Sequence, residues 1–434
     1  MSASESNHPT RRWLLSTCFM ALTALAACGG GDSGSAPPSP AAPATPAAPV
    51  APVAPVVPTP PPAAITSSTP MLAGGNGFSL ALMRDGSVFA WGDQQNGTLG
   101  NGNNAASSTR IPTRALNLAA ITRVAAGDAH GMALRNDGQV FIWGANGSGR
   151  LGLGQDGGAF ATPVALPGLA GITAIAAGER FSMALRADGT LFTWGDNSQG
   201  QLGLGDVQAR LSPTAVPGTG TVVAIAAGAN HALALRSDGS VLAWGKNSDG
   251  QLGVGDFDAR AVPTPVAALA GRGITQLAAG EFHSLALSSD GRVRGWGSSL
   301  RGEVGVAANT ANGFGNFVLP ALLPGVAGAS AIAAGARHSM ALLNDGTLRT
   351  WGDNGAGRLG NGLSGSFSQS TFVAQIPQIS TVTAIGAGKN HSLAIVADGR
   401  AACFGDNFFS QCGRIEIVDL TDPVEVGPGF NVGP

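Results

Sequence analysis

Histidine is the residue type with the most chemical potential in this sequence, because it recurs at one position of a repeated segment. Five copies of the segment carry it: His130, His231, His283, His338 and His391. A ring of imidazoles around one axis could hold a ligand or a metal ion. The other two copies carry Phe78 and Phe181 at this position, and phenylalanine fills space but ligates nothing. The pattern therefore favours a structural histidine that packs on the next copy and bonds its backbone.

Aspartate is the second residue type that could do chemistry at a repeated position, since every copy of the segment also carries an Asp-Gly pair. Two nearby carboxylates could act as general acid and base. An Asp-Gly pair between strand-like runs instead indicates a hairpin, and we expect a type I′ turn with positive φ at both central residues. The aspartates are Asp85, Asp137, Asp188, Asp238, Asp290, Asp345 and Asp398.

No catalytic constellation accompanies these residues. The sequence contains no Gly-x4-Gly-Lys phosphate loop, no Gly-x-Ser-x-Gly elbow and no His-Glu-x-x-His. Asp353 to Gly357 is faintly similar to a calcium loop but lacks its alternating acids and closing glutamate. We therefore predict a non-enzyme without cofactor or resident metal.

The elements that position these residues follow from the repeat itself. Its large aromatics are spaced by 52, 51, 50, 52, 55 and 53 residues: Trp91, Trp143, Trp194, Trp244, Trp296, Trp351 and Phe404. A period near 50 indicates a propeller or a solenoid, and the polar caps of a solenoid are missing. Each copy holds four strand-like runs, of which the last carries prolines and suits a sheet edge. We predict an all-β, seven-bladed β-propeller with four-stranded blades over residues 69–434.

The turn after each tryptophan carries a family signature. The pattern W-G-x-N-x-x-G-Q-L-G is nearly intact at 194–203 and 244–253. It resembles the regulator of chromosome condensation repeat family, over residues 69 to about 427. The resemblance implies a seven-bladed propeller. Members of this family include a nuclear exchange factor for a small GTPase, photoreceptors, kinase-linked modules and a secreted inhibitor of β-lactamase.

Residues 1–27 have the features of an export signal. Arg11 and Arg12 precede an apolar run of about 15 residues, which is short for a transmembrane helix of about 20. Leu25-Ala26-Ala27-Cys28 resembles a bacterial lipobox, in which Cys28 receives lipid. Gly29 resembles the default signal for the outer membrane of a Gram-negative cell. Export by the general or by the twin-arginine route fits the arginine pair.

Residues 28–68 form a linker rich in proline and alanine, with Asp32 as its only charge. Such a composition favours extended polyproline II, so about 35 residues could reach about 100 Å. Without residues 1–27 the chain has 22 basic and 25 acidic residues, a net charge of −3, and no basic run. We therefore expect no nucleic-acid partner.

Two cysteines remain after the signal and Cys28 are set aside. Cys403 and Cys412 are an even pair, and in an oxidising compartment we expect a disulfide between them; free thiols or a metal site are the alternatives.

Departures from the repeat supply the candidate binding residues. The longest spacing follows Trp296 and holds Phe314 and Phe317, repeat six has Phe367, and repeat seven places Phe408 and Phe409 in its second turn. Apolar residues on loops are candidate anchors for a partner. Packing of each loop on itself is the alternative.

Together these features predict a monomeric outer membrane lipoprotein, facing the periplasm or the cell surface. We expect it to act as a protein-interaction scaffold at the cell envelope through the loops of repeats five to seven. Inhibition of an extracellular enzyme is the alternative. Nucleotide exchange, as in the family's eponymous member, is disfavoured because export removes the GTPase.

Overall fold

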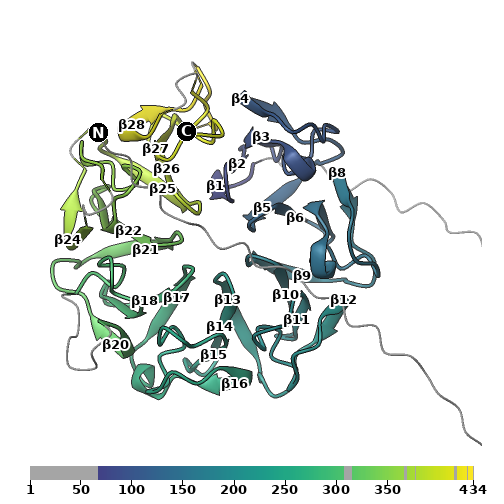
Figure 1. Ribbon diagram of the computed structural model, residues 1–434, viewed down its shortest axis with the longest axis vertical. Coiled ribbons are helices and arrows are strands. Elements are labelled where there is room, and N and C mark those ends of the chain that lie inside the picture. Colours follow the sequence, from purple (N-terminus) through teal and green to yellow (C-terminus); the bar gives the residue numbers. More distant parts are fainter. Residues whose placement is uncertain are drawn as a thin grey trace, which may run out of the picture. The chain divides into compact units, whose positions relative to one another are not determined.

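The computed structural model describes residues 67–306, 315–365, 369–376, 378–414, 418–427 and 429–433. Seven four-stranded antiparallel sheets surround a central channel (Figure 1). The predicted all-β, seven-bladed propeller is therefore confirmed. Each blade consists of four strands that are consecutive in the chain, including the first and the last blade.

The strands of a blade run in chain order from the channel outwards. The innermost are β1 (Met71–Gly74), β5 (Ile121–Ala126), β9 (Ile172–Ala177), β13 (Val222–Ala227), β17 (Ile274–Ala279), β21 (Ala329–Ala334) and β25 (Val382–Ala387). The second are β2 (Phe78–Leu82), β6 (His130–Arg135), β10 (Phe181–Arg186), β14 (His231–Arg236), β18 (His283–Ser288), β22 (His338–Leu343) and β26 (His391–Val396). The third are β3 (Val88–Asp93), β7 (Val140–Ala145), β11 (Leu191–Gly195), β15 (Val241–Gly245), β19 (Val293–Gly297), β23 (Leu348–Asp353) and β27 (Ala401–Gly405).

The outermost strands are β4 (Ser108–Arg114), β8 (Ala159–Ala165), β12 (Arg210–Ala215), β16 (Arg260–Pro265), β20 (Phe317–Leu322), β24 (Gln369–Gln375) and β28 (Leu420–Glu425). Short 3-10 turns lie at Gln95–Gly97, Gly147–Gly149 and Ala267–Leu269. Prolines such as Pro112, Pro163 and Pro423 lie in these outer strands, where no further strand needs their missing N–H. The predicted edge position of the proline-bearing run is confirmed.

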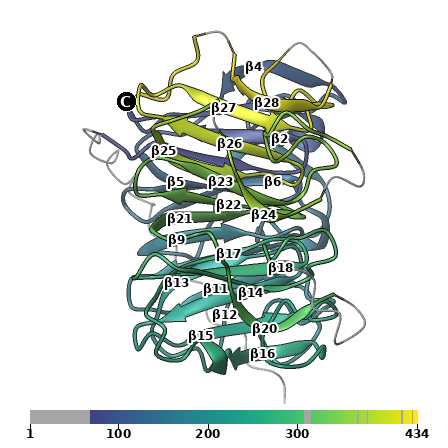
Figure 2. The same ribbon diagram turned by 90° about the vertical axis from the view of Figure 1, so that its left-hand side faces the viewer.

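Because consecutive strands are antiparallel, the connections alternate between two faces, visible edge-on in Figure 2. We call the strands of a blade A to D from the inside outwards. The AB and CD connections then lie on one side, the AB/CD face. The BC connections, and the DA connections that lead to the next blade, lie on the opposite side, the BC/DA face.

The Asp-Gly pairs lie in the BC turns as expected, but the type I′ turn is wrong. Of the Asp85-Gly86 pair only Gly86 has positive φ, 77°, and none of the seven aspartates does. Gly86 N donates to Met83 O, and Met83 N donates to Ser87 O, the pattern of a three-residue turn closed by a glycine bulge. Asp85 Oδ1 accepts Ser87 N at 2.9 Å. This side-chain bond holds the aspartate in an Asx turn, and glycine alone takes the left-handed conformation.

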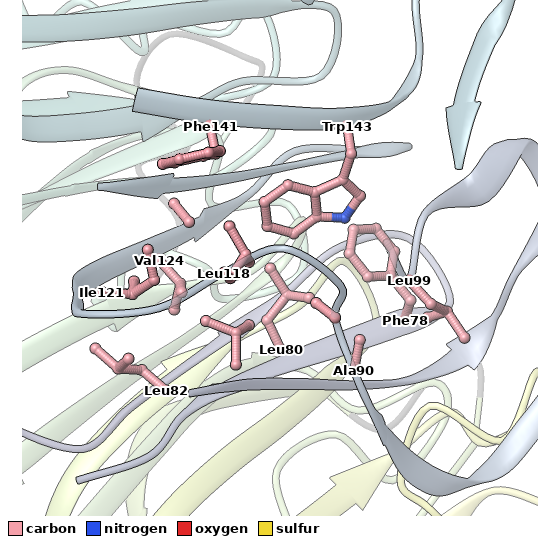
Figure 3. Close-up of a cluster of buried hydrophobic side chains, with 13 residues drawn as sticks. Phe78, Leu80, Leu82, Ala90, Leu99, Leu118, Ile121, Val124, Phe141 and Trp143 are labelled. Carbon is pink, nitrogen blue, oxygen red and sulfur yellow. The ribbon is translucent and has the colours of Figure 1, made fainter. Parts of the chain in front are cut away.

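The hydrophobic core lies between blades. Figure 3 shows the cluster between blades 1 and 2, where Leu80 and Leu99 meet Val124 and Trp143. The six tryptophans of the blades are fully buried, and each indole Nε1 donates to a CD-turn carbonyl of the preceding blade. The tryptophans therefore fill the space between neighbouring blades.

Each recurrent histidine bonds a serine of the next blade rather than the backbone that the sequence suggested. His283 Nε2 lies 2.8 Å from Ser339 Oγ, and Ser339 Oγ donates to Glu303 O, the carbonyl that also accepts Trp351 Nε1. The same pairing joins His130 to Ser182, His231 to Ser284, His338 to Ser392 and His391 to Ser79. The blades that follow Phe78 and Phe181 lack the serine and have Gly131 and Ala232 at that position.

This arrangement fixes the protonation of the histidines. The serine proton is used on the carbonyl, so the imidazole must donate from Nε2. Nδ1 is buried and makes no hydrogen bond within the described residues, so a proton there would have no acceptor and the ring stays neutral. Burial agrees, since it lowers the pKa of His283 to about 3. The glycine of each Ala-Ala-Gly run is required as well, because a Cβ at Gly280 would collide with the His283 ring.

The ring closes between blades 7 and 1 by the same contacts. His391 Nε2 lies 2.8 Å from Ser79 Oγ, and both Ser79 Oγ and Trp91 Nε1 donate to Gln411 O at 2.8 Å. The predicted disulfide between Cys403 and Cys412 is present and completely buried. It therefore holds the turn that carries the Gln411 carbonyl.

The C-terminal residues complete this junction. Phe430 packs edge-on against Trp91, with ring centroids 5.5 Å apart. Val432 O accepts Arg84 N of blade 1, and Val432 N donates to Gly399 O of blade 7. The tail thus bridges the first and last blades without contributing a strand to either.

We expect the Cys403→Thr/Cys412→Leu variant to lose about 2–3 kcal/mol of unfolding free energy, as for a loop with a sequence separation of 9. These residue types fit, because Thr193 and Leu202 occupy the same positions in blade 3, joined by a hydrogen bond of 2.8 Å. Hydrogen exchange should accelerate most in blades 1 and 7. Equal acceleration at the junction of blades 3 and 4 would contradict a role in closure.

Candidate functional site

The AB/CD face surrounds the mouth of the central channel. The seven AB turns line a cavity of about 130 Å³ there. Their backbones bond from blade to blade: Glu179 N donates to Ala229 O, Glu281 N to Ala336 O, and Lys389 N to Gly75 O. The last of these crosses the closing junction. The mouth is therefore a rigid backbone ring on which side chains can be displayed.

Acidic side chains dominate this mouth. Asp128, Glu179 and Glu281 line it together with Lys389, whose Nζ lies 3.4 Å from Asp128 Oδ1. Burial raises the pKa of Glu281 against the opposing effect of Lys389. Within the described residues no group of three or more His, Cys, Asp or Glu side chains is placed to hold a metal ion.

The CD turns are held by their signature asparagines. Asn197 is fully buried; its Oδ1 accepts Leu202 N at 2.9 Å and its Nδ2 donates to Asp206 O at 2.9 Å. Asn247 makes the same two contacts in blade 4. A buried amide that bonds both ends of the turn makes a stable platform for the exposed residues between them.

Phe408 and Phe409 lie on such a platform in blade 7. They are 65% and 41% exposed, and their rings meet edge-to-face with centroids 5.0 Å apart. Phe408 N donates to Asp406 Oδ1 and Phe409 N to Gln411 Oε1, so the backbone beneath both rings is fixed. Two adjacent exposed aromatics on a rigid turn form an apolar projection suited to a protein contact.

The other candidate phenylalanines differ from this pair. Phe317, expected on the long loop of repeat five, instead begins β20, where it pairs with Gly297 and packs half-buried against the core between blades 4 and 5. The loop assignment of Phe317 is therefore wrong, because the outer strand begins earlier than the sequence suggested. Phe314, Phe367 and Cys28 lie outside the described residues.

A cluster on blades 4 to 6 escaped the sequence analysis. Phe282, in the AB turn of blade 5, has Lys246 Nζ 5.1 Å and the Arg337 guanidinium 4.3 Å from its ring centroid. Leu300 is 56% exposed on the CD turn of blade 5. The available signal was Phe282 itself, which stands where blades 4 and 7 have Asn230 and Asn390.

Glu303 lies beneath this cluster, at the position that holds glutamine in blades 3, 4 and 7. Its side chain is fully buried, and Oε2 accepts Arg301 N at 2.8 Å. Oε1 accepts no hydrogen bond within the described residues and lies 3.9 Å from Arg337 Nη1. Burial raises the pKa of Glu303 to about 7, so this carboxyl changes charge near neutrality.

Comparison with known families supports one assignment for most of the chain. Residues 25–375 match the RCC1-like domain, and residues 382–411 match the regulator of chromosome condensation (RCC1) repeat. Across the described ranges, no helix is both long enough and apolar enough to cross a membrane.

Individual proteins show the same similarity. The ultraviolet-B receptor UVR8 of Arabidopsis thaliana is 31% identical over 363 residues, covering 82% of this chain and 69% of that protein. The probable E3 ubiquitin-protein ligase HERC6 of Homo sapiens is 32% identical over 337 residues, 77% of this chain but only 28% of that protein. The crystal structure of Prp20p from Saccharomyces cerevisiae superposes with a TM-score of 0.68 at 25% identity, covering 82% of this chain and 87% of that one.

Glu303→Gln should stabilise the protein in alkaline solution. With its folded pKa raised above its ordinary value of 4.5, Glu303 makes wild-type stability fall as pH rises from about 4.5 to about 7. At pH 8 the variant should therefore be more stable than the wild type by about 1–3 kcal/mol. Thermal unfolding at pH 5 and pH 8 measures this, and a stability difference independent of pH would contradict the buried, ionising carboxyl.

Proposed function

Because the chain belongs to the RCC1-like domain family, we propose that it is an exported, lipid-anchored propeller that binds a protein partner at the cell envelope. The observation that carries this proposal is the exposed Phe408–Phe409 pair on the AB/CD face. Aromatic side chains dominate the energetics of protein interfaces when they are presented on a rigid surface. The mouth and the CD turns provide that surface.

Family membership supports binding rather than catalysis. The solved relative Prp20p is described by its binding properties to Gsp1p and histones, both of which are proteins. The ubiquitin ligase HERC6 is much longer than the region shared with this chain, so its activity is not transferred here. We propose a non-enzymatic, monomeric binding module.

The N-terminal sequence supports the location. Leu25-Ala26-Ala27-Cys28 provides a lipobox, and the linker over residues 28–68 is long enough to hold the propeller away from a membrane. A buried disulfide suits a compartment outside the reducing cytoplasm. We place the protein on the outer membrane, facing the periplasm or the cell surface.

The Phe408→Ala/Phe409→Ala variant should lose its partner. Removing the two rings deletes exposed apolar surface without opening a cavity, so thermal stability should change little while recovery of the partner falls at least tenfold. Crosslinking of the intact lipoprotein in the envelope, followed by quantitative mass spectrometry, measures this recovery. Ile111→Ala/Val262→Ala is the matched control, because both residues are at least half exposed on outer strands. If the Phe408→Ala/Phe409→Ala variant recovered as much partner as the wild type, the proposed binding surface would be refuted.

Lipidation of Cys28 has its own test. Mass spectrometry of the mature N-terminus should find Cys28 as the first residue, carrying diacylglycerol. Cys28→Ala should remove the lipid and leave residues 1–27 attached, whereas Cys18→Ala, within the signal, should be processed normally. A mature wild-type protein that begins at another residue would exclude the anchor.

A further inference from the structure

The two faces of the propeller carry opposite net charge. We assign to each face its own turns and the adjoining three residues of each strand. On this count the BC/DA face holds eleven arginines and eight acids among the described residues, a net charge of +3. The AB/CD face holds eleven basic residues and fifteen acids, a net charge of −4. The small negative net charge of the described residues is therefore distributed unevenly, with one positive face and one negative face.

Two places on the BC/DA face carry this excess of arginine: Arg84, Arg114 and Arg123 beside blade 1, and Arg272, Arg292 and Arg294 around blade 5, each set with one aspartate. In other BC turns the arginine pairs with the turn aspartate: Arg135 with Asp137 and Arg186 with Asp188, each at 2.8 Å. Arg84, Arg114 and Arg123 differ, since no hydrogen bond or ion pair within the described residues holds their guanidinium groups. All three are exposed and available to an external anion.

Arg84 and Arg114 also border a hollow. A cavity of about 380 Å³ opens between them, with Met83, Phe89 and Val432 among its apolar lining residues. Asp85 lines it as well, and its pKa is lowered by hydrogen bonds from Ser87 and by the charge of Arg114, so two guanidinium groups face one carboxylate here. Guanidinium groups above an apolar floor suit an anion that is attached to hydrocarbon. A phosphate group can accept two parallel hydrogen bonds from one guanidinium.

The N-terminal segment joins the propeller at the same place. Ser68 N donates to Arg84 O, and Ser68 Oγ donates to Ile121 O at the start of blade 2. Ser68, close to the first residue that the structure describes, therefore lies at the BC/DA face, between Arg84 and the strand that carries Arg123. The proposed anchor is joined through the chain to this cationic corner of the propeller.

We propose that this corner, Arg84, Arg114 and Arg123 on the BC/DA face, docks the propeller on the phosphate head groups of anionic phospholipids. The proposal rests on the lipid anchor proposed above, because the tether supplies the high local concentration that makes a few phosphate contacts sufficient. Docking in this orientation turns the acidic AB/CD face, with Phe408 and Phe409, away from the membrane. The inference thus assigns one face to the membrane and the other to the partner.

The test uses the full-length lipidated protein in supported bilayers, with neutron reflectometry to measure how far the propeller lies from the membrane. On phosphatidylcholine with about one third phosphatidylglycerol we expect the propeller against the head groups. On phosphatidylcholine alone, or in high salt, it should move outward towards the reach of the tether, about 100 Å. Contact that is equally close on both bilayers would overturn the proposal.

A matched pair of variants tests which face of the propeller docks on the membrane. Arg84→Gln/Arg114→Gln should shift the equilibrium away from the docked state by about fivefold for each arginine. Arg110→Gln/Arg180→Gln removes the same charge from exposed sites on the AB/CD face and should leave docking unchanged. If both variants lost docking equally, the effect would depend only on net charge, and the proposed site would be refuted. Failure of the wild type to insert into any bilayer would instead count against the lipid anchor itself.

Discussion

The bond between histidine and serine across neighbouring blades is the contact on which this molecule depends. It ties an imidazole of one blade to a serine of the next, and the serine to the carbonyl that also receives a buried indole. Each component is buried, so each would be costly if left unpaired. The contact therefore explains the serine after the histidine position, the tryptophan and the glycine of the Ala-Ala-Gly run together.

Every blade of this ring is built from strands that are consecutive in the chain. The ring therefore depends on this contact most where the first and last blades meet. No strand is exchanged between the first and last blades, so side chains, the backbone bond from Lys389 N to Gly75 O and the C-terminal tail hold them together. The disulfide holds the turn that supplies the accepting carbonyl at this junction. Phe404 replaces the tryptophan in the same blade, but it packs at the junction of blades 6 and 7, whereas the closing junction keeps Trp91 next to the disulfide.

Sequence reasoning recovered what one repeat specifies by itself. The number of blades, the strand order and the structural role of His130 and its equivalents follow from spacing and from their replacement by phenylalanine. The serine partner was missed because it belongs to the next repeat. The sequence nevertheless contains the signal for it, since every blade that follows a histidine blade has serine at that position. The two blades that follow Phe78 and Phe181 have Gly131 and Ala232 there.

The positions of Phe317 and Phe282 were harder to predict. A strand boundary and a cluster drawn from three blades depend on packing, which the spacing of the repeat does not encode.

The polarity of the propeller explains how one repeat can serve two different surfaces. Structural demands occupy the buried strand and turn residues, which leaves the exposed positions in turns and at strand ends free to vary. Antiparallel strands send those positions alternately to the two faces, so substitutions in AB and CD turns accumulate on one face and substitutions in BC and DA turns on the other. Arg84 and Phe408 lie more than three hundred residues apart and on opposite faces. A difference in charge between faces can therefore arise without any change to the blades, and it gives this propeller a direction that its sevenfold repeat lacks.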